Sequence, residues 1–157
     1  MHYELCGMIA APEVLAGVVA AHVPARLVAL EQGLALVPVT DELATSLTQE
    51  SPVPPESGFW RLTGRVVALL ETTSIAGPVA YVEADYHGRE GRQTTAVWDC
   101  GAVVLGPLIL GCREPFPARG GGPVGAALRR VGAVAVGRRD EFVALGLGRC
   151  RSTGEWR

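Results

Sequence analysis

The sequence predicts a single α+β domain over residues 1–157, with a mainly antiparallel sheet and helices packed on one face. A length of 157 residues is typical of one domain. Hydrophobic residues make up 48% of the chain and charged residues 19%, which is a globular composition with enough apolar side chains for a core. The expected elements follow in the order β-α-β-β-α-α-β-β-β-α-α, which favours an antiparallel sheet with helices beside it.

The elements of the first third follow from local signals, namely apolar periodicity, prolines at helix boundaries and glycine at a tight turn. These signals predict a strand over 3–10, a helix that Pro12 begins and Pro24 ends, two strands within 26–39 around a turn at Glu31–Gly33, and a short helix after Thr40. The three prolines within Glu50–Ser57 then predict an extended loop.

The remaining elements follow from the same kinds of signal. They predict a helix that begins near Phe59 and stops before Gly77–Pro78, a three-stranded meander over 79–110 with turns at Arg89–Gly91 and Cys100–Gly101, an irregular loop over 114–123, helices over Pro123–Val131 and Asp140–Leu147, and an irregular tail that buries Trp156.

The first hairpin of the meander, Ala84 to Asp99, carries the polar residues that could support a function. Its sequence is ADYHGREGRQTTAVWD. A three-residue turn ending in Gly91 would pair Ala84 with Ala96 and turn an apolar face toward the helices. The opposite face would be open to solvent, and it would carry Tyr81, Glu83, Asp85, His87, Gln93, Thr95 and Asp99.

Three interpretations of this polar face remain open besides an ordinary solvated sheet. It could be an interaction surface, with Glu83, Asp85 and Asp99 meeting basic groups of a partner and with Tyr81, His87 and Trp60 beside them. It could be the site of a small hydrolase in which Glu83, Asp85 and His87 exchange protons. The same three residues could also act as metal ligands. Because no nucleophile or ligand motif stands elsewhere in the chain, we predict no catalytic residues, no metal and no cofactor.

Charge, cysteine spacing and the length of apolar segments limit the kinds of partner and the cellular compartment that we expect. The formal net charge of −2 and the absence of lysine weigh against a nucleic-acid partner. No apolar run is long enough to span a bilayer, and no secretory leader is recognised, so we expect no membrane association and a cytoplasmic protein. The four cysteines are scattered along the chain and form no zinc-binding motif, which is consistent with reduced thiols in the cytoplasm. They are Cys6, Cys100, Cys112 and Cys150.

Three stretches resemble a group of small actinobacterial hypothetical proteins: QGLALVPVTDEL, GPVAYVEADYHGREGRQTTAVW and LGLGRCRSTGEW. The resemblance covers most of the chain and implies no catalytic motif. In that group the hairpin turn tends to be an aromatic residue followed by glycines, whereas this chain has His87 followed by Gly88, Arg89, Glu90 and Gly91. As a small α+β protein with an acidic sheet face, the chain is also similar to the immunity proteins of bacterial toxin systems.

The sequence therefore favours a non-enzymatic cytoplasmic protein that binds another protein, such as an immunity protein or inhibitor. In this hypothesis an acidic sheet face covers a basic site on a toxin or enzyme. The alternatives are the small hydrolase and a subunit of a homo-oligomer.

Overall fold

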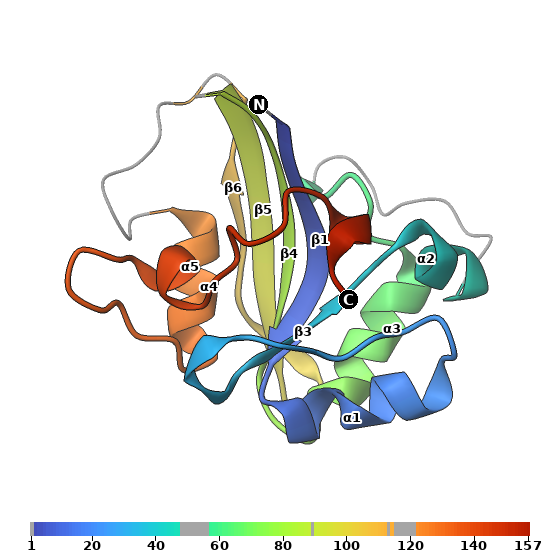
Figure 1. Ribbon diagram of the computed structural model, residues 1–157. Coiled ribbons are helices and arrows are strands. Elements are labelled where there is room, and N and C mark those ends of the chain that lie inside the picture. Colours follow the sequence, from blue (N-terminus) through green and yellow to red (C-terminus); the bar gives the residue numbers. More distant parts are fainter. Residues whose placement is uncertain (1, 48–56, 89, 113, 115–121) are drawn as a thin grey trace.

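The centre of the molecule is a six-stranded antiparallel sheet with strand order β2-β3-β1-β4-β5-β6 (Figure 1). The computed structural model describes residues 2–47, 57–88, 90–112, 114 and 122–157. The predicted α+β class and antiparallel sheet are confirmed. The elements in chain order are β1 (His2–Ala10), α1 (Pro12–Ala21), β2 (Val28–Ala29), η1 (Glu31–Gly33), β3 (Ala35–Pro38), α2 (Asp41–Leu47), α3 (Gly64–Thr73), β4 (Val79–His87), β5 (Glu90–Asp99), β6 (Ala102–Leu110), α4 (Pro123–Arg130), α5 (Glu141–Ala144) and η3 (Thr153–Glu155).

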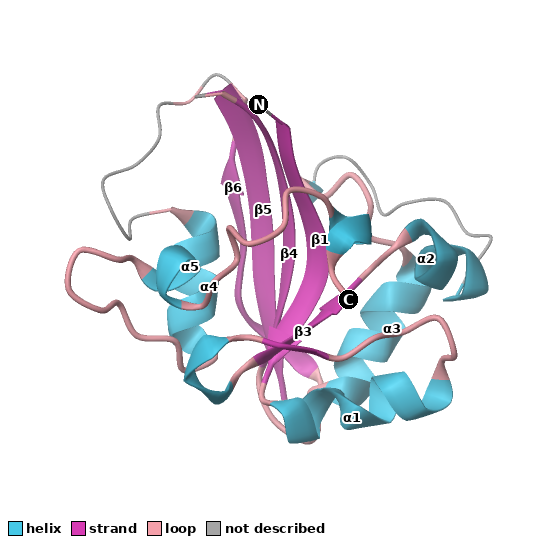
Figure 2. Cartoon of the chain, in the orientation of Figure 1, coloured by secondary structure: helices cyan, strands magenta, loops and turns pink. Residues whose placement is uncertain are grey.

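Helices cover both faces of the sheet, so the expectation that they pack on one face is wrong (Figure 2). On the first face, α1, α2 and α3 pack against residues such as Met8, Tyr81 and Trp98. On the second face, α4, the segment around α5 and the C-terminal tail pack against residues such as Ile9 and Val82. None of the helices in the described ranges has both the length and the hydropathy needed to cross a bilayer.

The physical reason for the two-sided core lies in β4. Its residues Val79 to Ala84, VAYVEA, are all buried, whereas a strand with one wet face would alternate between buried and exposed positions. Gln93 and Thr95 of β5 were expected to face solvent, but they hold the start of α4. The Val124 amide donates to Gln93 Oε1 at 3.1 Å, and Thr95 Oγ1 donates to the Pro123 carbonyl at 3.1 Å. These side chains form hydrogen bonds with backbone groups at the start of α4, and therefore do not need solvent as a hydrogen-bond partner.

The register of the β4–β5 hairpin also differs from the predicted one. Ala84 pairs with Gln93 rather than with Ala96, because the strands resume pairing at His87 and Glu90, immediately around a shorter turn. Gly88 supplies a positive φ of 62° there, and Arg89 lies outside the described residues. A shift of three residues along β5 is an odd number, so it changes which residues of the two strands share a face. Tyr81 and Glu83 thereby lie on the α1/α3 face of the sheet together with Ala96.

Gly91 lies in β5 opposite Tyr86 and is not the positive-φ residue of a turn. A Cβ atom at Gly91 would lie 2.5 Å from the Asp85 carbonyl oxygen and would overlap the Tyr86 ring. The position therefore requires glycine because of the close approach of β4, and the aromatic ring covers the glycine backbone.

Replacing Gly91 with alanine is expected to lower the free energy of unfolding by about 2–3 kcal/mol, because the backbone oxygen opposite it cannot move aside. Gly17→Ala is the matched control. Gly17 lies inside α1 with open space around a Cβ, so alanine there should raise stability by about 0.5–1 kcal/mol. Urea unfolding of both variants tests this, and equal effects at the two positions would contradict it.

The helix expected to begin near Phe59 begins five residues later, at Gly64. Thr63 is its N-cap, with its side-chain oxygen accepting a hydrogen bond from the Val66 amide. Phe59 is buried in the core that lies under α1 and α3. The residues before this helix follow a bent path over the sheet, where a buried carboxylate holds the amides of Trp60 and Arg61, as described below. Of the predicted loop Glu50–Ser57, only Ser57 is described, and most of the predicted loop 114–123 also lies outside the described residues.

The C-terminal segment runs along the half of β1 that β3 does not pair with (Figure 1). The Glu4 amide donates to the Arg151 carbonyl at 2.8 Å, and the Cys6 amide donates to Thr153 Oγ1 at 3.0 Å. The Thr153 amide in turn donates to Glu4 Oε1 at 2.8 Å. These bonds give the exposed strand edge hydrogen-bond partners, and the segment ends at Trp156, which is buried as predicted.

Candidate functional site

The register of β1, β4 and β5 places polar side chains in three parallel rows on the α1/α3 face of the sheet. Because side chains alternate between faces and cross-strand partners lie side by side, each row contains one residue from each strand. Exposure rises from the first row, which is buried, to the third, which is exposed. From the interior outward, the rows are Cys6–Glu83–Thr94, Glu4–Asp85–Arg92 and His2–His87–Glu90.

The inner row is centred on Glu83, whose side chain is fully buried. Its Oε1 accepts hydrogen bonds from the Trp60 and Arg61 amides at 2.8 and 3.1 Å, and its Oε2 accepts one from the Tyr81 hydroxyl at 2.7 Å. Burial raises the pKa of this carboxyl above its ordinary value, and the hydrogen bonds from Tyr81 and the two amides oppose the shift. Glu83 thus ties the segment before α3 to the sheet.

Cys6 and Tyr81 complete this buried network. The Cys6 sulfur lies 3.3 Å from the Tyr81 hydroxyl oxygen. Burial, together with the nearby Glu83, raises the pKa of the Cys6 thiol to about 12. Burial, together with Cys6 and Glu83, also raises the pKa of Tyr81. A thiol with so high a pKa stays protonated at neutral pH, so Cys6 is not an activated nucleophile.

The middle row joins the sheet to the segment before α3 through two arginines. The guanidinium of Arg92 stacks over the Trp60 ring, 3.8 Å from its centroid. The guanidinium of Arg61 lies between Asp41 at the start of α2 and Glu4 of β1, at 3.9 Å from Glu4 Oε2. These contacts hold Trp60 at the edge of the polar rows, where it is half-buried.

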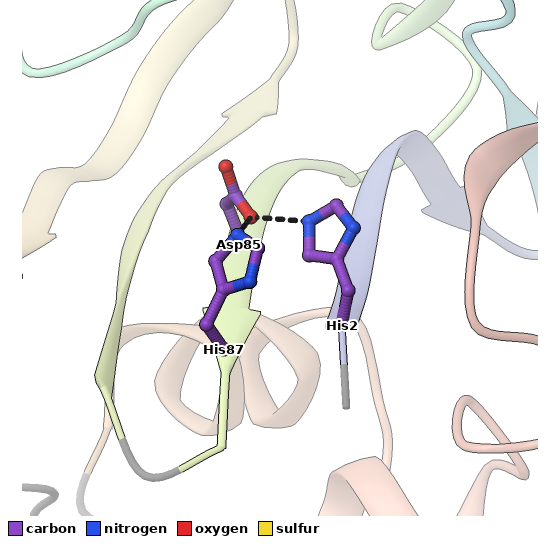
Figure 3. Close-up of side chains that lie close together, drawn as sticks. All are labelled: His2, Asp85 and His87. Carbon is purple, nitrogen blue, oxygen red and sulfur yellow. Dashed lines mark hydrogen bonds and ion pairs between the residues drawn. The ribbon is translucent and has the colours of Figure 1, made fainter.

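The outer row brings two histidines together beside Asp85 (Figure 3). His2 Nε2 lies 2.7 Å from Asp85 Oδ1, and His87 Nε2 lies 3.8 Å from the same oxygen. The two imidazole rings are stacked, with centroids 4.2 Å apart and planes inclined by 8°. The potential ligand atoms of the three residues all lie within 4.8 Å of one another. Within the described residues, these three side chains form a group whose spacing is compatible with a metal ion.

The outer row lies on an open surface. The side chains of His2 and His87 are 50% and 74% exposed, and that of Asp85 is 31% exposed. Two cavities of the described structure lie elsewhere. One, of about 680 Å³, is a groove between α1 and α3 that His22, Leu47 and Leu69 help to line. The other, of about 250 Å³, lies near Pro24 and Arg157.

The structure divides the six residues predicted from the sequence into three groups. Asp85 and His87 come together on the exposed surface, and Trp60 lies near them through its contact with Arg92. Glu83 and Tyr81 are buried, so their expected place on a solvent-facing surface is wrong. Asp99 lies seven residues beyond Arg92 along β5, which is about 23 Å from that row. The predicted acidic face is therefore not continuous.

The sequence reasoning missed His2, Glu4, Arg61 and Arg92 as members of the site. The available signal was the alternation His2–Glu4–Cys6 in β1, which repeats the polar pattern Glu83–Asp85–His87 of β4 in reverse order. Two strands with such patterns match when they pair antiparallel, and β1 and β4 do so.

Comparison with known proteins adds no relative to this description. No family model matches the chain, and neither the curated proteins nor the solved structures contain a match to it.

Proposed function

We propose that this protein is a non-catalytic binding protein that recognises another protein through its outer polar surface. This surface comprises His2, Trp60, Asp85, His87, Glu90 and Arg92. The observation that carries the proposal is the combination of a half-buried, solvent-accessible carboxylate, Asp85, with a stacked arginine–tryptophan pair on the same open sheet end. Tryptophan and arginine are enriched among the residues that dominate the energetics of protein interfaces. Here β5 holds Arg92, and Trp60 is fixed by the hydrogen bond from its amide to Glu83 and by the stacked guanidinium, so both are in place before binding.

The geometry supports recognition better than hydrolysis. A hydrolase using Glu83, Asp85 and His87 would need the three groups to converge on a substrate. Glu83 instead accepts hydrogen bonds from Tyr81 and two backbone amides inside the protein, while Asp85 contacts His2 and His87 at the surface. The raised pKa of Glu83 follows from burial, and its carboxylate oxygens have no free face toward a ligand.

The chemistry of the surface specifies a cationic contact on the partner. Asp85 would accept hydrogen bonds from an arginine or lysine of the partner, and the Trp60 ring would pack against the apolar part of that contact. An immunity protein or inhibitor that covers a basic site of a toxin or enzyme has this kind of contact, with neither membrane nor nucleic acid involved. A cytoplasmic location belongs to the proposal, and the four free thiols are consistent with it.

The test is capture of the partner from a lysate of the source cells, with EDTA present, followed by affinity measurement with the purified partner. Asp85→Arg should weaken binding by about 2 kcal/mol or more, which is roughly 30-fold in Kd, because it replaces attraction by repulsion. Asp99→Arg is the matched control, since it makes the same charge change at the far end of β5. Unchanged affinity for Asp85→Arg, or no partner retained by the wild type, would refute the proposal.

A further inference from the structure

His2, Asp85 and His87 are brought together by the sheet itself. His2 and His87 are cross-strand partners of β1 and β4, so their side chains project side by side on one face. Asp85 stands two residues before His87 on the same strand and therefore projects from the same face. The convergence of two imidazoles and one carboxylate thus depends on paired strands, and needs no ordering of a loop.

The distances within this cluster are close to those of a coordinated metal ion. In a tetrahedral zinc site with bonds of about 2.0–2.2 Å, neighbouring ligand atoms are about 3.3–3.5 Å apart. The two histidine nitrogens lie 2.7 and 3.8 Å from Asp85 Oδ1, on either side of that value, and all three ligand atoms lie within 4.8 Å of one another, so binding an ion requires the side chains to adjust. Exposed histidine side chains can tilt out of their stacked arrangement by small rotations, which would let both nitrogen lone pairs converge.

We propose that His2, Asp85 and His87 bind a divalent transition-metal ion, with Zn²⁺ as the ion that fits the ligand set. Two imidazole nitrogens and one carboxylate oxygen are donors that zinc accepts, and three protein ligands leave one position open for water or for a group of another molecule. This inference goes beyond the proposed recognition function and does not depend on it.

The charges around the cluster also favour a cation. Glu4 lies opposite Asp85 on β1, and Glu90 lies opposite His87 on β5, so two further carboxylates flank the three ligands. Arg92 and Arg61 are basic neighbours of the cluster: the guanidinium of Arg92 is directed over the Trp60 ring, and that of Arg61 is paired with Asp41 and lies 3.9 Å from Glu4 Oε2. A bound divalent ion would also screen Asp85 from these acidic neighbours.

The experiment is a titration of the ¹⁵N-labelled full chain with Zn²⁺, in a phosphine reductant, followed through the imidazole nitrogen signals in NMR spectra. His22, at the end of α1, serves as an internal reference because it lies outside the cluster. We expect the His2 and His87 signals to shift together and to reach saturation near one equivalent, while the His22 signals stay in place. The residue-specific signals separate this site from binding to the exposed thiols of Cys100 and Cys112.

Two variants make the test decisive. Asp85→Asn keeps the shape of the side chain and should weaken zinc binding at His2 and His87 at least about tenfold, because a charged ligand is lost. His22→Ala should leave that affinity unchanged. The inference is refuted if His2 and His87 shift no more than His22, or if Asp85→Asn binds zinc as the wild type does. Because the isolated protein is used, this result is independent of the partner capture described above.

Discussion

Replacing Glu83 with alanine is expected to lower the free energy of unfolding by about 3–5 kcal/mol, since it leaves one buried and two half-buried donors without an acceptor and opens a cavity. The donors are the Tyr81 hydroxyl and the amides of Trp60 and Arg61. Because these amides belong to the segment that leads into α3, the loss should also release Trp60 from the outer polar surface. Urea unfolding measures the first effect, and the Trp60 indole signal in NMR spectra reports the second.

Glu83→Gln is the informative control, because it keeps the shape of the side chain and removes the charge. Burial raises the pKa of Glu83 in the folded protein above its ordinary value of 4.5, so the folded state holds this proton more tightly than the unfolded state. The stabilisation from this group is therefore complete below pH 4.5 and is lost as the pH rises through the folded pKa. The stability of the wild type relative to Glu83→Gln should fall over that interval. Parallel pH profiles for the two proteins would contradict the assignment.

Trp156→Ala should cost a comparable amount, about 3–5 kcal/mol, because it leaves a large cavity in the second core. The Trp156 ring is 2% exposed and packs in the cluster that contains Leu5 and Leu147. Within the described residues, its indole nitrogen has no hydrogen-bond partner. Trp156→Phe, which retains an aromatic ring and removes that unpaired donor, should therefore cost at least 2 kcal/mol less, on the order of a conservative core exchange.

The same variant should loosen the C-terminal segment along β1. Hydrogen exchange at the Glu4 and Cys6 amides measures this directly, because their acceptors lie in Arg151 and Thr153. Exchange at both amides should speed up in Trp156→Ala by more than at amides in the centre of β4. Uniform acceleration across the sheet would show that the segment has no local role in holding the edge of β1.

Features that depend on a few neighbouring residues were predictable. Pro12 and Pro123 each begin a helix where the sequence placed one, because proline suits the first turn of a helix. The turn at Cys100–Gly101 also lies where it was predicted, with φ values of 52° and 83° at its two residues. The α+β class followed from the order of such elements.

The register of the β4–β5 hairpin was not predictable from the same kind of pattern. The run from Val79 to Ala84 is apolar on both faces apart from Glu83, so the alternation of the sequence does not show the three-residue shift along β5. Glu83 is tolerated in the core only because the Tyr81 hydroxyl and the backbone of Trp60 and Arg61 reach it. Those partners come from a segment whose path depends on the completed core.

The candidate site shows the same division between local and long-range information. The strand pattern was enough to predict that Asp85 and His87 share one face, because side chains in a strand repeat with a period of two. The position of His2 beside them and the burial of Glu83 and Tyr81 depend on long-range packing. The reason is that β1 pairs with β4 although some 80 residues separate them, and that the segment before α3 covers Glu83 and Thr94 of the inner row. Such pairings depend on burial and hydrogen bonding summed over the whole sheet, which no short stretch of sequence contains.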